Sequence, residues 1–364
     1  MKIGIDISQI VYQTGVSRYT AELVRNLLKF DEKNQYSLYA GSLRARPTIK
    51  AFVATLPRKT KLVLTPLSPK LAEMAFNKFN LPIDQWLGAV DVFHASNWTI
   101  PKTQVPLVTT IHDLTFLKYP QEHLASQVAA HRRQLERAKK RAAAIIAVSQ
   151  ATKKDLIEAG IKAEKIHVIY EAAAAIFKPL EDKRKLLLIK AKYQLTKPFI
   201  LSVGTQEPRK NIKRLIQAYE GLKPKNLGLV IVGKFGWGEK TKPVPGVRLL
   251  GFVPDEDLVG LYSAAQVFVY PSLYEGFGLP VVEALSCGCP VVTSNVSSLP
   301  EIGGPAAVYV DPTSVKGITQ GMVAAMKQAK SLRPAGLLQA KQFSWEKTAR
   351  ETLKIYQKVY AHRH

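Results

Sequence analysis

Cysteine is almost absent from this chain of 364 residues, which contains only Cys287 and Cys289, in the string CGC. This spacing is too tight for an ordinary structural disulfide, and no third or fourth metal ligand stands nearby. The sequence therefore excludes a disulfide scaffold and a cysteine-based metal site, and we interpret both residues as small side chains that fill space after a helix. The absence of disulfides fits a reducing cytoplasm, which is the expected location of the protein.

Long apolar runs are also absent. No stretch of about 18 uninterrupted apolar residues occurs, so no segment is predicted to span a membrane. The first residues, MKIGIDIS, alternate like a strand and lack the charged region, apolar run and cleavage site of a signal peptide. Hydrophobic residues nevertheless make up 46% of the chain, which is typical of a globular protein and not of a disordered one. The length predicts two domains.

Acidic residues are scarce, because 28 Asp and Glu face 52 Lys and Arg and leave a formal net charge of +24. This balance favours anionic partners: nucleic acid, an acidic membrane surface or phosphorylated substrates. The cations form patches, such as RKTK at 58–61 and HRRQLERAKKR at 131–141. The second run has helical character, with Leu135 and Ala138 on one side. A solvated helix face, a membrane-surface patch and a nucleic-acid patch all stay open as its role.

Strand-like and helical segments alternate along the whole chain. The strand-like runs of the first half are KIGIDIS, YSLYA, KLVLT, VDVFHAS, PLVTTIHD, AAIIAVS and KIHVIY, and those of the second half are PFILSVGT, LGLVIVGK, VRLLGFV, QVFVYPS, PVVTSN and AAVYVDP. Such alternation predicts parallel sheets covered by helices on both faces, and two series in tandem predict two doubly wound α/β domains. We expect domains at 1–171 and 172–345, a linker at 171–185 and a final helical segment at 346–364.

Ligands of doubly wound folds bind at the carboxyl ends of the strands. The second half offers three such junctions, at 202–211 (SVGTQEPRKN), 231–238 (IVGKFGWG) and 272–284 (SLYEGFGLPVVEA). In the third junction, Pro280 suits the first turn of a helix that Gly288 ends. The turn before that helix consists of Gly276, Phe277, Gly278 and Leu279. Free N–H groups and the positive end of the helix dipole would bind an anion there.

Charged side chains surround this turn. Arg209 and Lys210, from the neighbouring strand end, can neutralise a diphosphate. Glu283, within about the first turn of the helix, can accept hydrogen bonds from a ribose diol. Glu275 precedes the turn and can face a sugar attached to the outer phosphate. Either acid alone is better explained as an ordinary loop or helix residue, but the joint spacing with GFGLP and PRK favours a nucleotide-sugar site.

These residues also carry a family resemblance. The chain resembles family 4 retaining glycosyltransferases of the GT-B architecture, and in particular the bacterial mannosyltransferases of surface polysaccharide assembly. The similar stretches are VGTQEPRKNIKRLIQAY, LGFVPDEDLVGLYSAAQVFVYPSLYEGFGLPVVEALSCGCPVV and SNVSSLPEIGG. The resemblance covers nearly the whole chain and is strongest over about 198–312. It implies two Rossmann-like domains facing across a cleft, a donor held mainly by the second domain, and a final helix that returns to pack on the first.

By position, the resemblance implies a role for each matching residue. Glu283 would bind the donor ribose, and Glu275 would contact hydroxyls of the donor sugar near the reacting carbon. Arg209 and Lys210 would neutralise the diphosphate, while Gly278 and Leu279 offer backbone N–H groups within the turn that also contains Gly276 and Phe277.

Five further positions follow from the same resemblance. His112 would reach the donor sugar from the first domain, and Gly15 would let the phosphate or acceptor approach the end of the first strand. Phe252 and Val253 would border the base. Thr205 stands where many relatives carry an arginine, so phosphate neutralisation depends on fewer cations. Many relatives also have paired glycines where this chain has Gly15 alone, which leaves the acceptor side less defined.

The implied reaction moves a hexose, with mannose favoured, from a nucleotide sugar to a glycan or lipid-linked acceptor with retention of configuration. The donor would be GDP-mannose or a UDP-hexose, and no cofactor or metal is expected. The string Asp255-Glu256-Asp257 is predicted to open a helix, where acids suit the dipole, and not to bind a metal. We expect peripheral contact with the cytoplasmic face of an anionic membrane. We do not expect nucleic acid as a partner.

Three other functions stay open as alternatives. A glycoside hydrolase or phosphorylase could use Glu275 and Glu283, although the anion-binding turn between them would then have no purpose. A nicotinamide-dependent oxidoreductase would need a GxGxxG string after a strand with an acid about 20 residues further on, which is missing. A nucleic-acid-binding protein would fit the charge, but no finger, recognition helix or aromatic sheet motif supports it.

Overall fold

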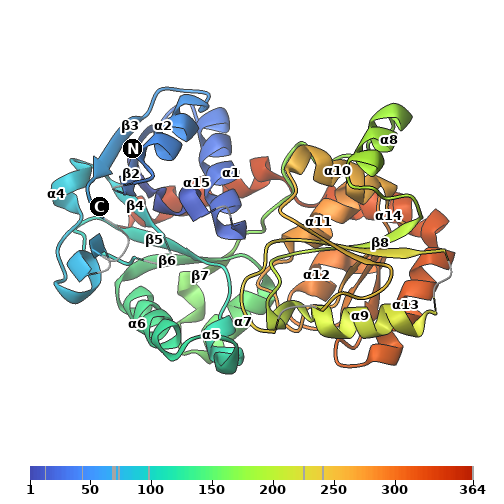
Figure 1. The fold of residues 1–364 in the computed structure, drawn as a ribbon. Coiled ribbons are helices and arrows are strands. Elements are labelled where there is room, and N and C mark those ends of the chain that lie inside the picture. The colour runs from blue at the N-terminus through green and yellow to red at the C-terminus, as the bar shows by residue number, and fades with distance from the viewer. Residues whose placement is uncertain are drawn as a thin grey trace. The chain divides into compact units, whose positions relative to one another are not determined.

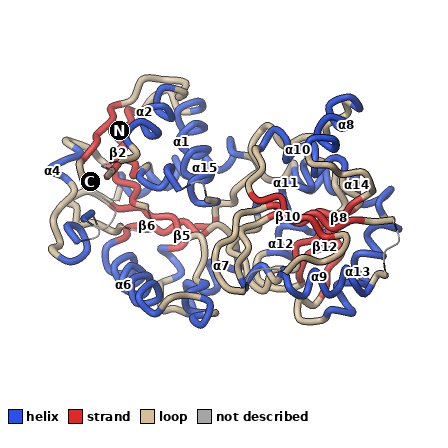
Figure 2. Tube along the Cα trace, in the orientation of Figure 1, coloured by secondary structure: helices blue, strands red, loops and turns tan. Residues whose placement is uncertain are grey.

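The computed structural model describes residues 1–12, 14–42, 44–67, 71–72, 74–96, 99–223, 226–239 and 242–362. The chain divides into two compact units (Figure 1). The first unit comprises Met1–Glu171 and Trp345–His364, and the second comprises Ala172–Ser344. Each unit contains a parallel sheet with helices packed against it (Figure 2).

The first unit is built on a seven-stranded sheet in the order β3-β2-β1-β4-β5-β6-β7. Its strands are β1 (Lys2–Asp6), β2 (Gln35–Gly41), β3 (Lys61–Thr65), β4 (Val92–Ala95), β5 (Leu107–Ile111), β6 (Ala142–Ala147) and β7 (Ile166–Val168). Its helices are α1 (Gly15–Phe30), α2 (Arg46–Ala54), α4 (Asp84–Leu87), α5 (Thr115–Lys118), α6 (Ala125–Arg141), α7 (Gln150–Glu158) and α15 (Trp345–Ala361). Short helical turns are η1 (Ser8–Tyr12), η2 (Met74–Lys78), η3 (Pro120–Glu122) and η4 (Ala163–Lys165).

The second unit is built on a six-stranded sheet in the order β10-β9-β8-β11-β12-β13. Its strands are β8 (Phe199–Val203), β9 (Gly228–Val232), β10 (Val247–Gly251), β11 (Val267–Tyr270), β12 (Val291–Ser294) and β13 (Ala307–Val310). Its helices are α8 (Lys183–Lys192), α9 (Ile212–Gly221), α10 (Asp255–Ala264), α11 (Leu279–Ser286), α12 (Leu299–Gly303), α13 (Val315–Lys327) and α14 (Ala329–Ala340), with short turns η5 (Pro208–Lys210) and η6 (Gly304–Ala306).

Both sheets reverse their strand order in the middle, as dinucleotide-binding sheets do. In the first unit the reversal lies between β1 and β4, and in the second between β8 and β11. The inner strands are apolar and covered on both faces; every residue of β5, β11 and β12 is buried. The predicted fold class, α/β with two doubly wound Rossmann-like parts, is therefore confirmed.

The final helix belongs to the first unit although its residues come last in the chain. α15 lies against α1, and its buried residues recur every three or four positions. They are Trp345, Thr348, Ala349, Thr352, Ile355, Tyr356 and Val359. Figure 1 shows this red helix among the blue elements of the first unit. The expected return of the final helix to the first domain is thus confirmed.

Local sequence signals account for several element ends. Ser149 caps α7 by accepting a hydrogen bond from Thr152 N at 3.0 Å, and Gly160 follows the helix with a φ of 84°. Cys287 and Cys289 are free and buried at the end of α11, as predicted. None of the helices within the described ranges is both long and apolar enough to cross a membrane.

One predicted boundary needs correction. The linker was expected at 171–185, but residues 183–185 already form the first turn of α8. Asp182 caps this helix, because its carboxylate accepts hydrogen bonds from the backbone N–H groups of Arg184 and Lys185. The Asp before the cations is the helix start signal that decides the structure.

Candidate functional site

Two loops meet where the strand order of the second unit reverses. One follows β8 and leads into η5, and the other follows β11 and leads to α11. Backbone and side-chain bonds join them, since Leu273 N donates to Arg209 O at 2.9 Å and Arg209 Nη1 donates to Tyr274 O at 2.7 Å. The loops that carry the predicted cations and the predicted acid are therefore adjacent, as the topology rule requires.

A buried ion cluster connects the loops. Arg209 Nη1 lies 2.8 Å from Glu275 Oε2, and Lys210 Nζ lies 2.7 Å from Glu275 Oε1. Lys210 also donates to Tyr270 OH at 2.5 Å, and Arg209 Nη2 pairs with Glu207 at 2.7 Å. The side chains of Arg209, Lys210 and Glu275 are 14%, 12% and 9% exposed, so solvent screens these ion pairs little.

The cluster fixes the charge state of Glu275. Burial alone would raise the pKa of its carboxyl group, but the charges of Arg209 and Lys210 and the hydrogen bond from Lys210 lower that pKa to about 2. Burial and the neighbouring Arg209 lower the pKa of Lys210. Arg209 stays charged, because a guanidinium keeps its proton at any ordinary pH.

The turn beyond Glu275 opens α11 as predicted. Gly278 is the N-cap with a left-handed φ of 110°, and Pro280 lies in the first helical turn. A Cβ on Gly278 would come within 3.0 Å of Leu299, so both backbone angle and space require glycine. Gly276, Phe277 and Leu279 are buried around it.

Glu283 lies slightly further along the helix than expected. It is the fifth residue of α11 and not part of its first turn, and it is 1% exposed. Its Oε2 accepts a hydrogen bond from Tyr262 OH on α10 at 3.1 Å. A buried carboxylate needs hydrogen-bond donors of this kind. It can lose one of them only if another donor, such as a ligand hydroxyl, takes its place.

Three further predicted residues of the second unit lie at the same edge of its sheet. Thr205 is exposed in the loop after β8, where a Cβ on Gly236 would come within 2.8 Å of its methyl group. Phe252 and Val253 follow β10. Val253 is 4% exposed, whereas Phe252 is 60% exposed and has Lys234 Nζ 5.1 Å from its ring centroid.

The remaining two predicted residues belong to the first unit. Gly15 is the exposed first residue of α1, after the Thr14 cap. His112 directly follows β5, and its Nδ1 lies 3.0 Å from Glu171 Oε1. Asp113, the next residue, accepts a hydrogen bond from Thr115 N at 3.0 Å and so shapes the start of α5.

Sequence reasoning missed the residues that hold the turn. Asn211 adopts a left-handed φ of 61° and donates through Nδ2 to Pro271 O and Pro312 O, at 2.9 and 2.6 Å. Ser297 Oγ accepts from Glu275 N at 3.0 Å, and Ser298 Oγ donates to Glu275 O at 3.0 Å and to Phe277 O at 2.7 Å. An Asn directly after PRK and a Ser pair before LPE are local signals, but only contacts reveal what they bind.

No metal centre accompanies these residues in the described parts of the chain, where no group of three or more His, Cys, Asp or Glu could hold an ion. Asp255, Glu256 and Asp257 form the first turn of α10, as predicted. Asp257 bonds to Lys192 Nζ at 2.5 Å and to Tyr193 OH at 2.6 Å.

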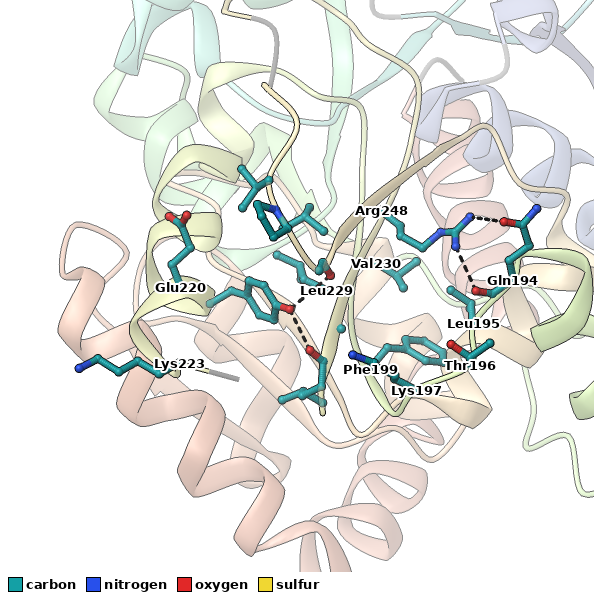
Figure 3. A pocket seen from close by; sticks show the side chains of 17 residues that line it. Gln194, Leu195, Thr196, Lys197, Phe199, Glu220, Lys223, Leu229, Val230 and Arg248 are labelled. Atoms are coloured by element: carbon teal, nitrogen blue, oxygen red, sulfur yellow. Dashed lines mark hydrogen bonds between the residues drawn. The ribbon is translucent and has the colours of Figure 1, made fainter. Parts of the chain in front are cut away.

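A cavity of about 660 Å³ lies at the opposite edge of the second sheet. Figure 3 shows its lining, which includes Phe199 and residues next to the amino ends of β9 and β10. There Arg248 donates to the backbone oxygen and the side-chain oxygen of Gln194. None of the predicted site residues lines this cavity, and parallel sheets bind their ligands at the other edge.

The ion cluster makes a stability prediction. The folded pKa of Glu275 lies near 2, below its ordinary value of 4.5, so the stability that its charge contributes is present above pH 4.5 and lost as the pH falls through 2. The shift corresponds to about 3 kcal/mol at neutral pH. We expect Glu275→Gln to lower the free energy of unfolding at pH 7 and to flatten its decline below pH 4.5. Urea denaturation across this range measures both effects, with the exposed Glu220→Gln as control. Parallel pH curves for the parent and Glu275→Gln would contradict the assignment.

Two family descriptions together match most of the chain. "Glycosyltransferase Family 4" matches residues 13–172 and "Glycosyl transferases group 1" matches residues 165–336. The O-antigen chain mannosyltransferase B of Escherichia coli is 34% identical, over 98% of this chain and 99% of that protein. The serotype-specific mannosyltransferase WbdA of Escherichia coli is 33% identical over 70% of this chain, which matches only 34% of that longer protein.

Solved structures share the fold at lower identity. Sucrose-phosphate synthase from Thermosynechococcus elongatus superimposes with a TM-score of 0.73 at 20% identity, over 100% of both chains. Alr3699/HepE of Anabaena, in a complex with UDP and glucose, superimposes with a TM-score of 0.73 at 18% identity, over 98% of this chain and 99% of that one. With the two Rossmann-like sheets and the returning α15, these matches show that the chain belongs to the family 4 glycosyltransferases of the GT-B fold.

Proposed function

We propose that this glycosyltransferase moves a hexose, with mannose favoured, from a nucleotide sugar to a hydroxyl of a glycan or lipid-linked acceptor, with retention and without a metal or other cofactor. The observation that carries the proposal is the buried cluster of Arg209, Lys210 and Glu275 beside the N-terminus of α11. The name of the mannosyltransferase B relative favours GDP-mannose as donor. A UDP-hexose is the alternative, in keeping with the UDP and glucose bound to HepE.

The cluster supplies what the reaction needs at the leaving group. When the bond between the sugar carbon and the phosphate oxygen breaks, negative charge collects on the diphosphate. Arg209, Lys210 and the N–H groups of Gly278 and Leu279 would stabilise that charge. If they lower the barrier by about 4 kcal/mol, the rate rises on the order of a thousandfold. The acceptor hydroxyl would attack from the face that the phosphate leaves and give its proton to the departing phosphate oxygen.

Donor binding would change the partners of Glu275. Its two oxygens now hold both cations, which are the groups that phosphate oxygens would take. Phosphate binding would therefore release carboxylate oxygens to accept hydrogen bonds from the sugar. In this scheme Glu283 binds the ribose diol, Thr205, Gly276 and Phe277 shape the phosphate turn, and Phe252 and Val253 border the base. His112 contacts the donor sugar, and Gly15 leaves room for the phosphate or acceptor.

The donor assignment predicts a split between the two acids. A screen of GDP, UDP, ADP and their sugars should find a nucleotide that raises the melting temperature by mass action. Glu283→Gln should weaken that nucleotide about tenfold or more, because a hydrogen bond to a charged group is worth roughly 1.5–3 kcal/mol. Glu275→Gln should keep the rise in melting temperature with nucleotide, since the carboxylate that competes with the phosphates for Arg209 and Lys210 is gone. The same variant should no longer release the nucleoside diphosphate. Glu220→Gln is the control. A flat screen, or an unchanged affinity in Glu283→Gln, would refute the donor site.

We further propose that the first unit contacts an anionic membrane through α6. This helix buries Leu135 and Ala138 and exposes Arg132, Arg133 and Lys140. Exposed cations of this kind are attracted to acidic lipid headgroups. The other basic patch fits less well, because Arg58 Nε donates to Leu28 O at 2.9 Å within the unit.

Liposome sedimentation tests this contact. The parent should bind vesicles of acidic lipid and not of neutral lipid, and high salt should release it. Replacing Arg132, Arg133 and Lys140 with Gln should reduce binding severalfold. The matched control replaces Lys183, Arg184 and Lys185 of α8 with Gln and removes the same charge. Equal recovery of the parent in the supernatant with both lipids would exclude the contact. Equal losses of binding in both triple variants would assign the binding to net charge instead of α6.

A further inference from the structure

His112, the residue of the first unit that is predicted to reach the donor sugar, has a buried acid as its partner. His112 Nδ1 lies 3.0 Å from Glu171 Oε1, and the two side chains are 14% and 5% exposed. Glu171 is the last residue of the first unit before the chain enters the second. No motif or resemblance assigned it a role. A buried carboxylate is costly unless it is bonded, so this placement needs an explanation.

The carboxylate decides which nitrogen of His112 carries the proton. An ionised carboxylate only accepts hydrogen bonds, so the bond requires a proton on Nδ1. In a neutral ring Nε2 then has a free lone pair. Among the described residues, no hydrogen bond to this Nε2 is found. Nε2 can therefore accept a hydrogen bond from a hydroxyl group.

Neighbouring side chains fix the plane of the ring. The Tyr19 ring from α1 packs edge-on against His112, with centroids 4.7 Å apart. Tyr19 OH lies 3.0 Å from Thr110 Oγ1 on β5, which lies 3.0 Å from His94 Nε2 on β4. His94 Nδ1 in turn lies 2.6 Å from Tyr356 OH on α15. Burial and then the nearby His112 lower the pKa of His94 to about 3, so this histidine is neutral in the chain of hydrogen bonds.

The first turns of α15 support both partners of His112. Trp345 packs on Tyr19 with ring centroids 5.8 Å apart. Thr348 Oγ1 donates to Tyr170 O at 2.6 Å, next to Glu171 in the chain. Asp6, which lines a pocket together with His112, is already occupied, because it accepts from Ser8 N at 2.9 Å and from Thr99 Oγ1 at 3.1 Å.

We propose that Glu171 is a positioning residue for sugar transfer: it holds the Nδ1–H form of His112 and thereby presents Nε2 as the acceptor for a hydroxyl of the donor sugar. This inference rests on the proposed function, because it needs His112 to meet the donor. It adds that the acid and the first turns of α15 set the orientation and tautomer on which that contact depends.

Nitrogen-15 NMR of the full chain labelled at histidine tests the tautomer directly. The signals of His112 are those lost in His112→Gln. In the parent, we expect Nδ1 to carry the proton. Glu171→Ala should shift His112 toward the Nε2–H form and lower the rate of nucleoside diphosphate release tenfold or more. Glu171→Gln should rescue part of both, because its amide oxygen still accepts the bond. The nucleotide melting shift should stay unchanged in both variants. Glu164→Gln, at an exposed acid of the same unit, is the matched control.

Each outcome separates the two proposals. An Nε2–H form of His112 in the parent would overturn the role of Glu171 whether or not the Glu171 variants fold. Unchanged tautomer and turnover in Glu171→Ala would do the same. If His112→Gln keeps full turnover while Glu171→Ala still changes the tautomer, the pairing holds and the role proposed for His112 in transfer fails.

Discussion

The site of the second unit depends on the ion pairs that the carboxylate of Glu275 forms with Arg209 and Lys210. Two cations lie side by side in a buried loop junction, and without an anion they would repel each other and pay a large desolvation cost. Glu275 faces Arg209 with one oxygen and Lys210 with the other. Asn211, Ser297 and Ser298 hold the surrounding backbone, so the protein itself fixes the geometry of the cluster. An arrangement of this kind would present preorganised cations to the diphosphate of the proposed donor.

The first unit uses the same principle with different residues. There an acid at the end of one segment holds a base at the end of a strand, through the Glu171–His112 contact. In both units the acid lies outside the regular elements, in a position that the sheet topology brings next to its partner. A buried acid therefore acts twice as the support of the group that would meet the substrate, and each is costly to remove because its partner would lose its counter-group.

Much of this architecture follows from the sequence, and the parts that do not follow have a common cause. Alternating apolar runs predicted both sheets, and Pro280 with Gly288 predicted the extent of α11. The positions of Glu275, Arg209 and Lys210 at neighbouring strand ends also predicted that these three residues lie at one junction. Spacing could not show that Glu275 binds both cations, because a pairing across 65 residues has no periodic signal. The sequence did not predict the pairing of Glu171 with His112 for the same reason, since the two residues are 59 positions apart.

The return of α15 to the first unit has a consequence beyond packing. A helix that only covered apolar surface would need a stripe of apolar residues, yet α15 also buries Thr348, Thr352 and Tyr356. Two of these make hydrogen bonds toward the environment of His112, one to Tyr170 O and one to His94. Buried polar groups cost free energy unless they are satisfied, and satisfied ones fix a unique geometry in a way that apolar contacts do not. The end of the chain therefore contributes orientation as well as burial, and the precision of the His112 ring depends on residues more than 230 positions away from it in the sequence.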